Sequence, residues 1–179
     1  KDIIAYFRLI GNHHDEEVIK RIINYPVRGI GNTTITKITA SAQKFGVSLW
    51  EVICHPVNYQ LDINKGTIAK LDAFRELISS FIENASTTDA YELGKKIIKV
   101  SGISAELFSS TDSESLSRQE NLEEFLSGMR DFVEIRKEEG RGNEIYLTDY
   151  LHEISLISDL DSERDEESRV MLMTVHTAK

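Results

Sequence analysis

Residues 15–46 read DEEVIKRIINYPVRGIGNTTITKITASAQKFG, and this stretch decides the fold. Each half carries apolar residues three or four positions apart, and a segment with one proline and two glycines separates the halves. Apolar residues at this spacing share one side of a helix. The stretch therefore predicts two amphipathic helices joined by a tight turn over residues 26–31.

The ends of both helices carry residue types that are typical of helix boundaries. Asp15 can cap the first helix, which we expect to run to about residue 24. Asn32 or Thr33 can cap the second helix. This second helix is expected to end at about Phe45, because Gly46 follows and glycine commonly terminates helices.

Helical patterns continue along most of the remaining chain. The 179 residues include only two prolines and ten glycines, which favours helices over the many turns of an all-β domain. We expect a mainly α, monomeric fold with loops over residues 58–66 and 109–117, an acidic linker over residues 159–168 and a short buried strand over residues 170–176. Further helices are expected over residues 1–10 and after residues 47, 66, 87, 117 and 146.

The charge of the chain is unevenly distributed. The net charge is −9, yet residues 1–60 carry seven basic and five acidic residues, against 14 basic and 25 acidic residues in the remainder. A phosphate-binding surface is therefore expected in the first third, because acidic surfaces repel polyanions. The absence of long apolar runs predicts no membrane span, and the single cysteine excludes an internal disulfide.

Several familiar ligand motifs are excluded by their missing residues. Gly29 and Gly31 begin like a dinucleotide-binding fingerprint, but Thr34 stands where the third glycine is needed, and no strand pattern precedes them. Residues 159–163 have the acidic spacing of a calcium loop, but Arg164 and Val170 replace its glycine and its last glutamate. The five histidines have no zinc-protease spacing, and no P-loop is present. We therefore expect no metal site, no cofactor and no catalytic residues in this chain.

The turn at residues 28–33 is the best candidate binding site. Two glycines let the backbone approach a ligand closely, and the helix that follows presents free N–H groups and a positive dipole end to an anion. An ordinary helix–helix turn would need glycine equally, with Ile30 as its anchor in the core, so the residue types leave both interpretations open. The candidate residues are Arg28, Gly29, Ile30, Gly31, Thr33 and Lys37.

Five segments, in order, resemble UvrD/PcrA/Rep-type superfamily one DNA helicases. They cover nearly the whole chain, which makes the resemblance specific. They are KDIIAYFRLI (1–10), RIINYPVRGIG (21–31), RQENLEEF (118–125), LHEISLISD (151–159) and VMLMTVHTAK (170–179). The last segment resembles the start of helicase motif V. The chain is therefore identified as a fragment of such a helicase.

The resemblance implies the organisation of this fragment. Residues 11–167 would form the helical 2B subdomain with a helix-hairpin-helix-like element, while residues 1–10 and 168–179 would be edges of the RecA-like domain 2A. Gly29, Ile30 and Gly31 would touch the backbone of duplex DNA, and Thr174 and His176 would contact single-stranded DNA.

The resemblance also implies a role for the whole protein. It would be a cytoplasmic, ATP- and Mg²⁺-dependent 3′-to-5′ DNA helicase in repair or replication, with domains 1A, 1B and 2A as partners of this fragment. The fragment alone would be an inactive accessory and regulatory domain. The alternative function is an acidic, helical protein-interaction module without direct DNA contact. A stand-alone enzyme lacks support, because no catalytic constellation is present.

Overall fold

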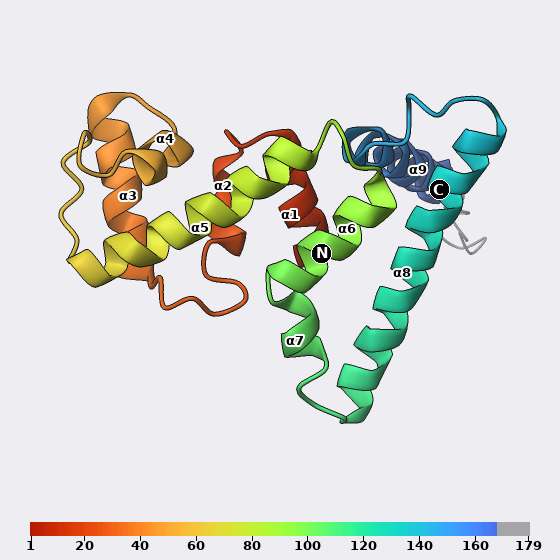
Figure 1. The fold of residues 1–179 in the computed structure, drawn as a ribbon, viewed down its shortest axis with the longest axis horizontal. Coiled ribbons are helices and arrows are strands. Elements are labelled where there is room, and N and C mark those ends of the chain that lie inside the picture. Colours follow the sequence, from red (N-terminus) through yellow and green to blue (C-terminus); the bar gives the residue numbers. More distant parts are fainter. Residues whose placement is uncertain (168–179) are drawn as a thin grey trace, which may run out of the picture.

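The computed structural model describes the backbone of residues 1–167 and the side chains of residues 1–157, and every regular element in this part is a helix (Figure 1). The predicted mainly α fold is thus confirmed. The strand expected at residues 170–176, and with it Thr174 and His176, lies outside the described residues. The helices are α1 (Asp2–Gly11), α2 (Glu16–Ile22), α3 (Asn32–Phe45), α4 (Leu49–Cys54), α5 (Lys65–Asn84), α6 (Ala90–Val100), α7 (Ile103–Leu107), α8 (Ser113–Glu138) and α9 (Leu147–Glu167).

Helix α5 runs through the middle of the molecule and connects its two ends (Figure 1). α3 and α4 pack together at the end where α5 begins. α1 packs on α2, α5, α6 and α9, and α8 packs on α6. α7 and the first half of α8 form an arm that projects from this body (Figure 1). The turn links α2, near the middle of the molecule, to α3 at the end where α5 begins (Figure 1).

The apolar stripes predicted from the sequence form a single core. The stripe of α5 is completely buried at Leu71, Phe74, Ile78 and Phe81. Burying each such side chain contributes about 1.5–3 kcal/mol relative to leaving it in water. The prediction fails at the ends of two stripes. Phe45 of α3 is 37% exposed and packs edge-on against Tyr59, and Ile157 of α9 is 52% exposed. The boundary between domain 2A and subdomain 2B, predicted at residue 10, stays a prediction. In the structure α1 belongs to the same hydrophobic core as the helices that follow it.

Helices α6 and α8 approach closely because α6 has a glycine at their contact. A Cβ on Gly94 would lie 2.8 Å from the Cε of Met129 and 3.3 Å from the Cζ of Phe7. A larger residue would therefore require the end of the flexible Met129 side chain to move or the two helices to separate.

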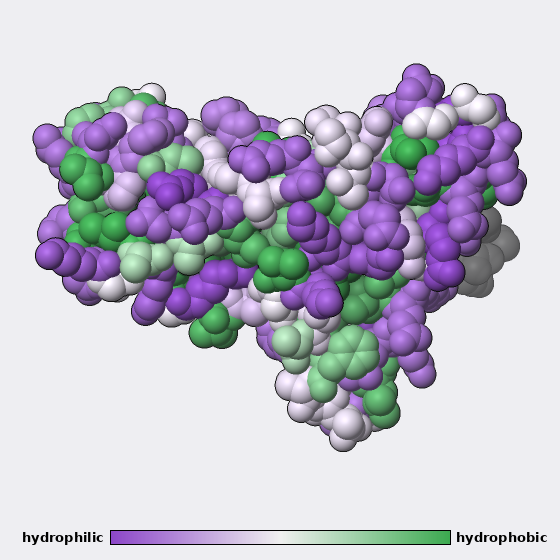
Figure 2. Space-filling model, in the orientation of Figure 1, coloured by the Kyte–Doolittle hydropathy of each residue, from purple (hydrophilic) through white to green (hydrophobic). Residues whose placement is uncertain are grey.

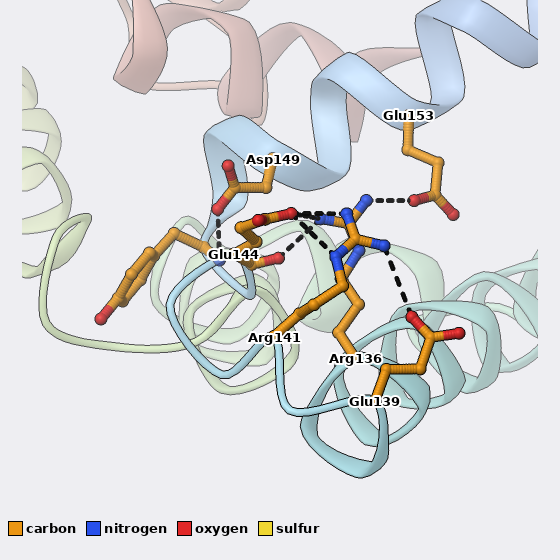
Figure 3. A network of polar contacts seen from close by, with 7 residues as sticks. Arg136, Glu139, Arg141, Glu144, Asp149 and Glu153 are labelled. Atoms are coloured by element: carbon orange, nitrogen blue, oxygen red, sulfur yellow. Dashed lines mark hydrogen bonds and ion pairs between the residues drawn. The ribbon is translucent and has the colours of Figure 1, made fainter.

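A network of charged side chains fastens the end of α8 to α9 (Figure 3). The side chain of Arg136 is only 13% exposed, donates to the carbonyl oxygen of Glu144 at 2.8 Å and pairs with Glu153 of α9 at 2.5 Å. Its guanidinium lies 4.3 Å from the ring centroid of Phe132. The loop between the two helices is thus held against a largely buried cation.

Two loop predictions are wrong because helices extend into them. α8 begins at Ser113, inside the loop expected over residues 109–117, because the carboxylate of Asp112 accepts the N–H of Ser115 at 2.9 Å and caps the helix. α9 continues to Glu167, through most of the acidic linker expected over residues 159–168. Once a helix has formed, each added residue costs little and gains one hydrogen bond, so no apolar stripe is required.

Candidate nucleic-acid interface

The turn between α2 and α3 is built around the side chain of Asn24. Its Oδ1 accepts the N–H of Arg28 at 2.9 Å and the N–H of Ile30 at 3.0 Å. Asparagine commonly organises turns in this way, by bonding to the backbone that follows it. The side chain of Ile30 is fully buried, as predicted. The turn is therefore fixed from inside, and Gly29 and Gly31 are left exposed on its outer side.

Gly29 adopts a conformation that favours glycine. Its φ is +71°, in the left-handed region that side chains disfavour. A Cβ at this position would also lie 2.7 Å from the Nζ of Lys70. Lys70 belongs to α5 and donates to the carbonyl oxygen of Gly29 at 3.1 Å. The fold thus places an exposed ammonium group on the outer side of the turn.

Gly31 occupies the N-cap position of α3, where the sequence predicted Asn32 or Thr33. No side chain caps this helix. In the described part of the chain no acceptor is recorded for the N–H groups of Gly31, Asn32 and Thr33, and all three residues are exposed. The positive end of the α3 dipole is therefore open to solvent, as an anion site requires.

Arg28 is partly buried, and its guanidinium is directed at other parts of the chain. Its guanidinium donates to carbonyl oxygens within the turn and to groups of α1 and α6. The DNA contact predicted for Arg28 stays a prediction.

Thr33 and Lys37 lie on the exposed side of α3, as predicted. The Nζ of Lys37 donates to the carbonyl oxygen of Asp62 at 2.6 Å and lies 3.5 Å from its carboxylate. That carboxylate is completely exposed, so water and salt weaken the pair. Lys37 can therefore exchange Asp62 for a phosphate at small cost.

Two residues that build the site were not found from the sequence. Asn24 precedes a proline-containing turn, which is a usable signal for an asparagine-organised turn. Lys70 has no local signal, because it lies 41 residues from Gly29 and reaches the turn only through the packing of α5.

The surroundings of the turn limit what else the site can do. Figure 2 shows mainly hydrophilic side chains on the visible face, with hydrophobic ones in several places, including the end with α3 and the region around α7. Within residues that the structure describes, no group of three or more histidine, cysteine or acidic side chains is arranged to hold a metal ion. None of the helices described there has the length and apolar character of a membrane span.

The fold and the turn define the class as a helical domain that exposes a glycine turn at a helix N-terminus. The sequence model of the UvrD-like helicase C-terminal domain matches residues 1–179, and the chain belongs to this family. The chain is 33% identical over 179 residues to an ATP-dependent DNA helicase PcrA from Staphylococcus epidermidis and 32% identical to one from Staphylococcus aureus. These alignments cover 100% of the chain and 24% of each relative, so the chain spans about a quarter of their length.

Proposed function

We propose that this chain is a duplex-DNA-contacting, regulatory accessory domain of a cytoplasmic, ATP-dependent 3′-to-5′ DNA helicase that acts in repair or replication. The open N-terminus of α3 beside Lys70 is the observation that carries the proposal. Both groups suit phosphate oxygens, and backbone amides bind phosphate without reading base sequence. A helicase that moves along DNA of any sequence needs contacts of this kind.

In this proposal the turn binds one phosphate of the duplex backbone. The N–H groups of Gly31, Asn32 and Thr33 point at the phosphate, and Lys70 supplies the charge. Lys37 contacts a neighbouring phosphate after leaving Asp62. The buried side chain of Ile30 holds the turn without touching DNA, so any contact by this residue is made by its backbone.

The rest of the activity is proposed for the longer protein. ATP and Mg²⁺ would bind elsewhere in the longer protein, because this chain has no P-loop, and domains 1A, 1B and 2A would be the partners of this chain. Thr174 and His176 would contact single-stranded DNA in the complete protein.

We expect the chain to bind duplex DNA weakly and without sequence preference. Because few phosphates are engaged and the net charge is −9, the dissociation constant should be about 10⁻⁴ M or weaker at physiological salt, and binding should weaken as salt rises. The ¹⁵N-labelled chain can be titrated with two duplexes of unrelated sequence. Both duplexes should shift the amide signals of Gly29, Gly31 and Thr33 to the same extent. Shifts that favour one sequence or ignore salt would contradict the proposal.

Variants of single lysines refine this experiment. Lys70→Ala and Lys37→Ala should each lower duplex affinity about two- to fivefold at low salt, as expected for one exposed charge contact. Lys44→Ala removes the same charge at the opposite end of α3, where Lys44 donates to Gln60, and serves as the matched control. A loss in Lys44→Ala as large as in Lys70→Ala would mean that only net charge matters.

The purified chain should neither bind nor hydrolyse ATP. Its sequence lacks the glycine-rich loop and lysine that hold nucleotide phosphates in such enzymes. A coupled phosphate-release assay, with and without single-stranded DNA, should give the rate of a buffer blank. Measurable turnover by the pure chain that is stimulated by DNA would contradict this prediction.

A second candidate function is protein interaction, and one observation favours it. A groove of about 520 Å³ lies between α1, α7 and α8, with Ile4, Leu107 and Phe125 in its lining. Phe108 and Leu116, at the tip of the arm, are 54% and 46% exposed. If a duplex shifts no signal of the turn, this function takes precedence.

A further inference from the structure

Arg28 makes an unusually large number of contacts for one side chain at a turn. Its Nη1 donates to the carbonyl oxygens of Ile22, Tyr25 and Pro26 at 3.2, 2.8 and 3.1 Å. Its Nη2 donates to the hydroxyl of Tyr6 at 2.6 Å and to the carbonyl oxygen of Ser101 at 3.0 Å. One guanidinium thus joins the segment that precedes the glycine turn to α1 and to the end of α6.

The aromatic contacts of Arg28 add a fourth element to this junction. The guanidinium carbon lies 5.8 Å from the ring centroid of Tyr6 and 5.6 Å from that of Phe74 on α5. The Tyr6 hydroxyl in turn donates to the carbonyl oxygen of Tyr25. Burial raises the pKa of Tyr6 and the Arg28 charge opposes that rise, so the phenol stays protonated at neutral pH and can donate.

The partners of Arg28 are neutral groups. No ion pair of Arg28 is recorded among the residues that the structure describes, and its acceptors are four carbonyl oxygens and one phenol. Removing a charge from water, even in part, is costly unless its donors find acceptors, and Arg28 is partly buried. Here the N–H groups of the guanidinium donate mainly to backbone carbonyl oxygens. These bonds fix the path of the chain immediately before Gly29.

We propose that Arg28 is the positioning residue of the glycine turn, holding the turn and the first N–H groups of α3 where a phosphate can reach them. This inference rests on the function proposed above, and it assigns Arg28 a role through the backbone and not through DNA contact. Lysine cannot replace Arg28, because an ammonium group lacks the two planar NH₂ groups of a guanidinium. These two groups reach the turn carbonyls on one side and Tyr6 and Ser101 on the other. The bond from the Arg28 N–H to Asn24 then keeps Gly29 and Gly31 on the outer side.

Arg28→Lys tests the proposal because it keeps the charge and removes the fork. We expect the N–H groups of Arg28 and Ile30, which are bonded to Asn24, to exchange with solvent at least about tenfold faster, since a loss of about 1.4 kcal/mol in local opening corresponds to this factor. Amides of α5 and α8 should stay protected. Duplex affinity should fall about fivefold, because a mobile turn must be ordered on binding.

Ile78→Val is the matched control. Ile78 is completely buried on α5 and lies outside the recorded contacts of the turn, so this variant lowers global stability without removing any bond of Arg28. We expect Ile78→Val to leave the duplex affinity unchanged. The exchange rates of the Arg28 and Ile30 amides, compared with those set by global unfolding, should also stay unchanged. Equal changes in Ile78→Val and Arg28→Lys would overturn the proposal, because both would then follow stability alone.

The two readouts separate this inference from the proposed function. If the wild-type chain does not bind duplex DNA, the proposed function fails, while the exchange measurement still decides whether Arg28 holds the turn. Unchanged exchange in Arg28→Lys would overturn the positioning role even if DNA binds. Should Arg28→Lys not fold, Tyr6→Phe removes one acceptor of Arg28 together with the bond that the Tyr6 hydroxyl donates to Tyr25. Faster exchange of the same two amides is then expected, and unchanged exchange would again overturn the role.

Discussion

Gly31→Asp is expected to lower duplex affinity at least about tenfold while making α3 slightly more stable. Aspartate is a better N-cap residue than glycine by a few tenths of a kcal/mol, and its charge also favours the positive end of the helix. Its carboxylate would accept the same N–H groups that the proposed phosphate uses. Losing one or more charged hydrogen bonds, each worth about 1.5–3 kcal/mol, corresponds to a tenfold or larger loss in affinity.

The structure has room for a side chain at position 31, so this substitution should not disturb the fold. Gly31 has extended backbone that any residue adopts, and a Cβ there meets nothing within 4 Å. The turn can therefore accept a side chain at position 31, and Gly31→Val should also fold. Because binding and stability are expected to change in opposite directions, misfolding cannot account for a loss of binding.

Gly142→Asp is the matched control for the added charge. Gly142 is also exposed, and a Cβ there meets nothing within 4 Å. It lies in the loop between α8 and α9, away from the turn (Figure 1). Fluorescence anisotropy with a labelled duplex at low salt, together with thermal melting, measures both effects. If Gly31→Asp binds as well as Gly142→Asp, the turn does not hold a phosphate and the protein-interaction function takes precedence.

Phe74→Ala is expected to lower the free energy of unfolding by about 3–5 kcal/mol, the usual cost of emptying a fully buried phenylalanine site. Phe74 is completely buried in the middle of α5, and its ring centroid lies 6.4 Å from that of Trp50 on α4. It also lies beneath the Arg28 guanidinium. Since single domains have stabilities of about 5–15 kcal/mol, this change removes a large share of the total.

Urea unfolding followed by far-ultraviolet circular dichroism measures the loss. Phe108→Ala is the control, because Phe108 is 54% exposed and its truncation should cost less than about 1 kcal/mol. Equal small losses in both variants would mean that Phe74 does not contribute to a shared core.

The helices that could be predicted are those whose signals are local. Asp15 and Ser48 accept N–H groups from Val18 and Glu51 as their positions suggested, and Gly46 ends α3 with a φ of 67°. These features depend on residues within one turn of the chain, so the sequence contains them directly.

The parts that could not be predicted depend on contacts between distant segments or on weak composition signals. Lys70 reaches Gly29, and Arg28 reaches Ser101, through tertiary packing over 41 and 73 residues. The same residue types at the turn would suit a DNA-contacting Arg28 equally well, and only its internal acceptors distinguish the two roles. The start of α8 and the end of α9 were predicted wrongly from their acidic composition, because acidic residues occur in both loops and helices.

The distribution of helices along the molecule also has a consequence for how the chain meets a polyanion. The glycine turn lies in the net-basic third, whereas α9 carries eight acidic residues and one basic residue at the other end of the molecule (Figure 1). The field of a duplex exerts a torque on a molecule with such a charge asymmetry. This torque turns the acidic end away from the duplex before contact occurs. Electrostatic steering of this kind selects productive encounters and speeds association, and it acts over about one Debye length, roughly 8–10 Å in physiological salt. If the turn binds a duplex as proposed, the acidic helix would help to orient the domain on it.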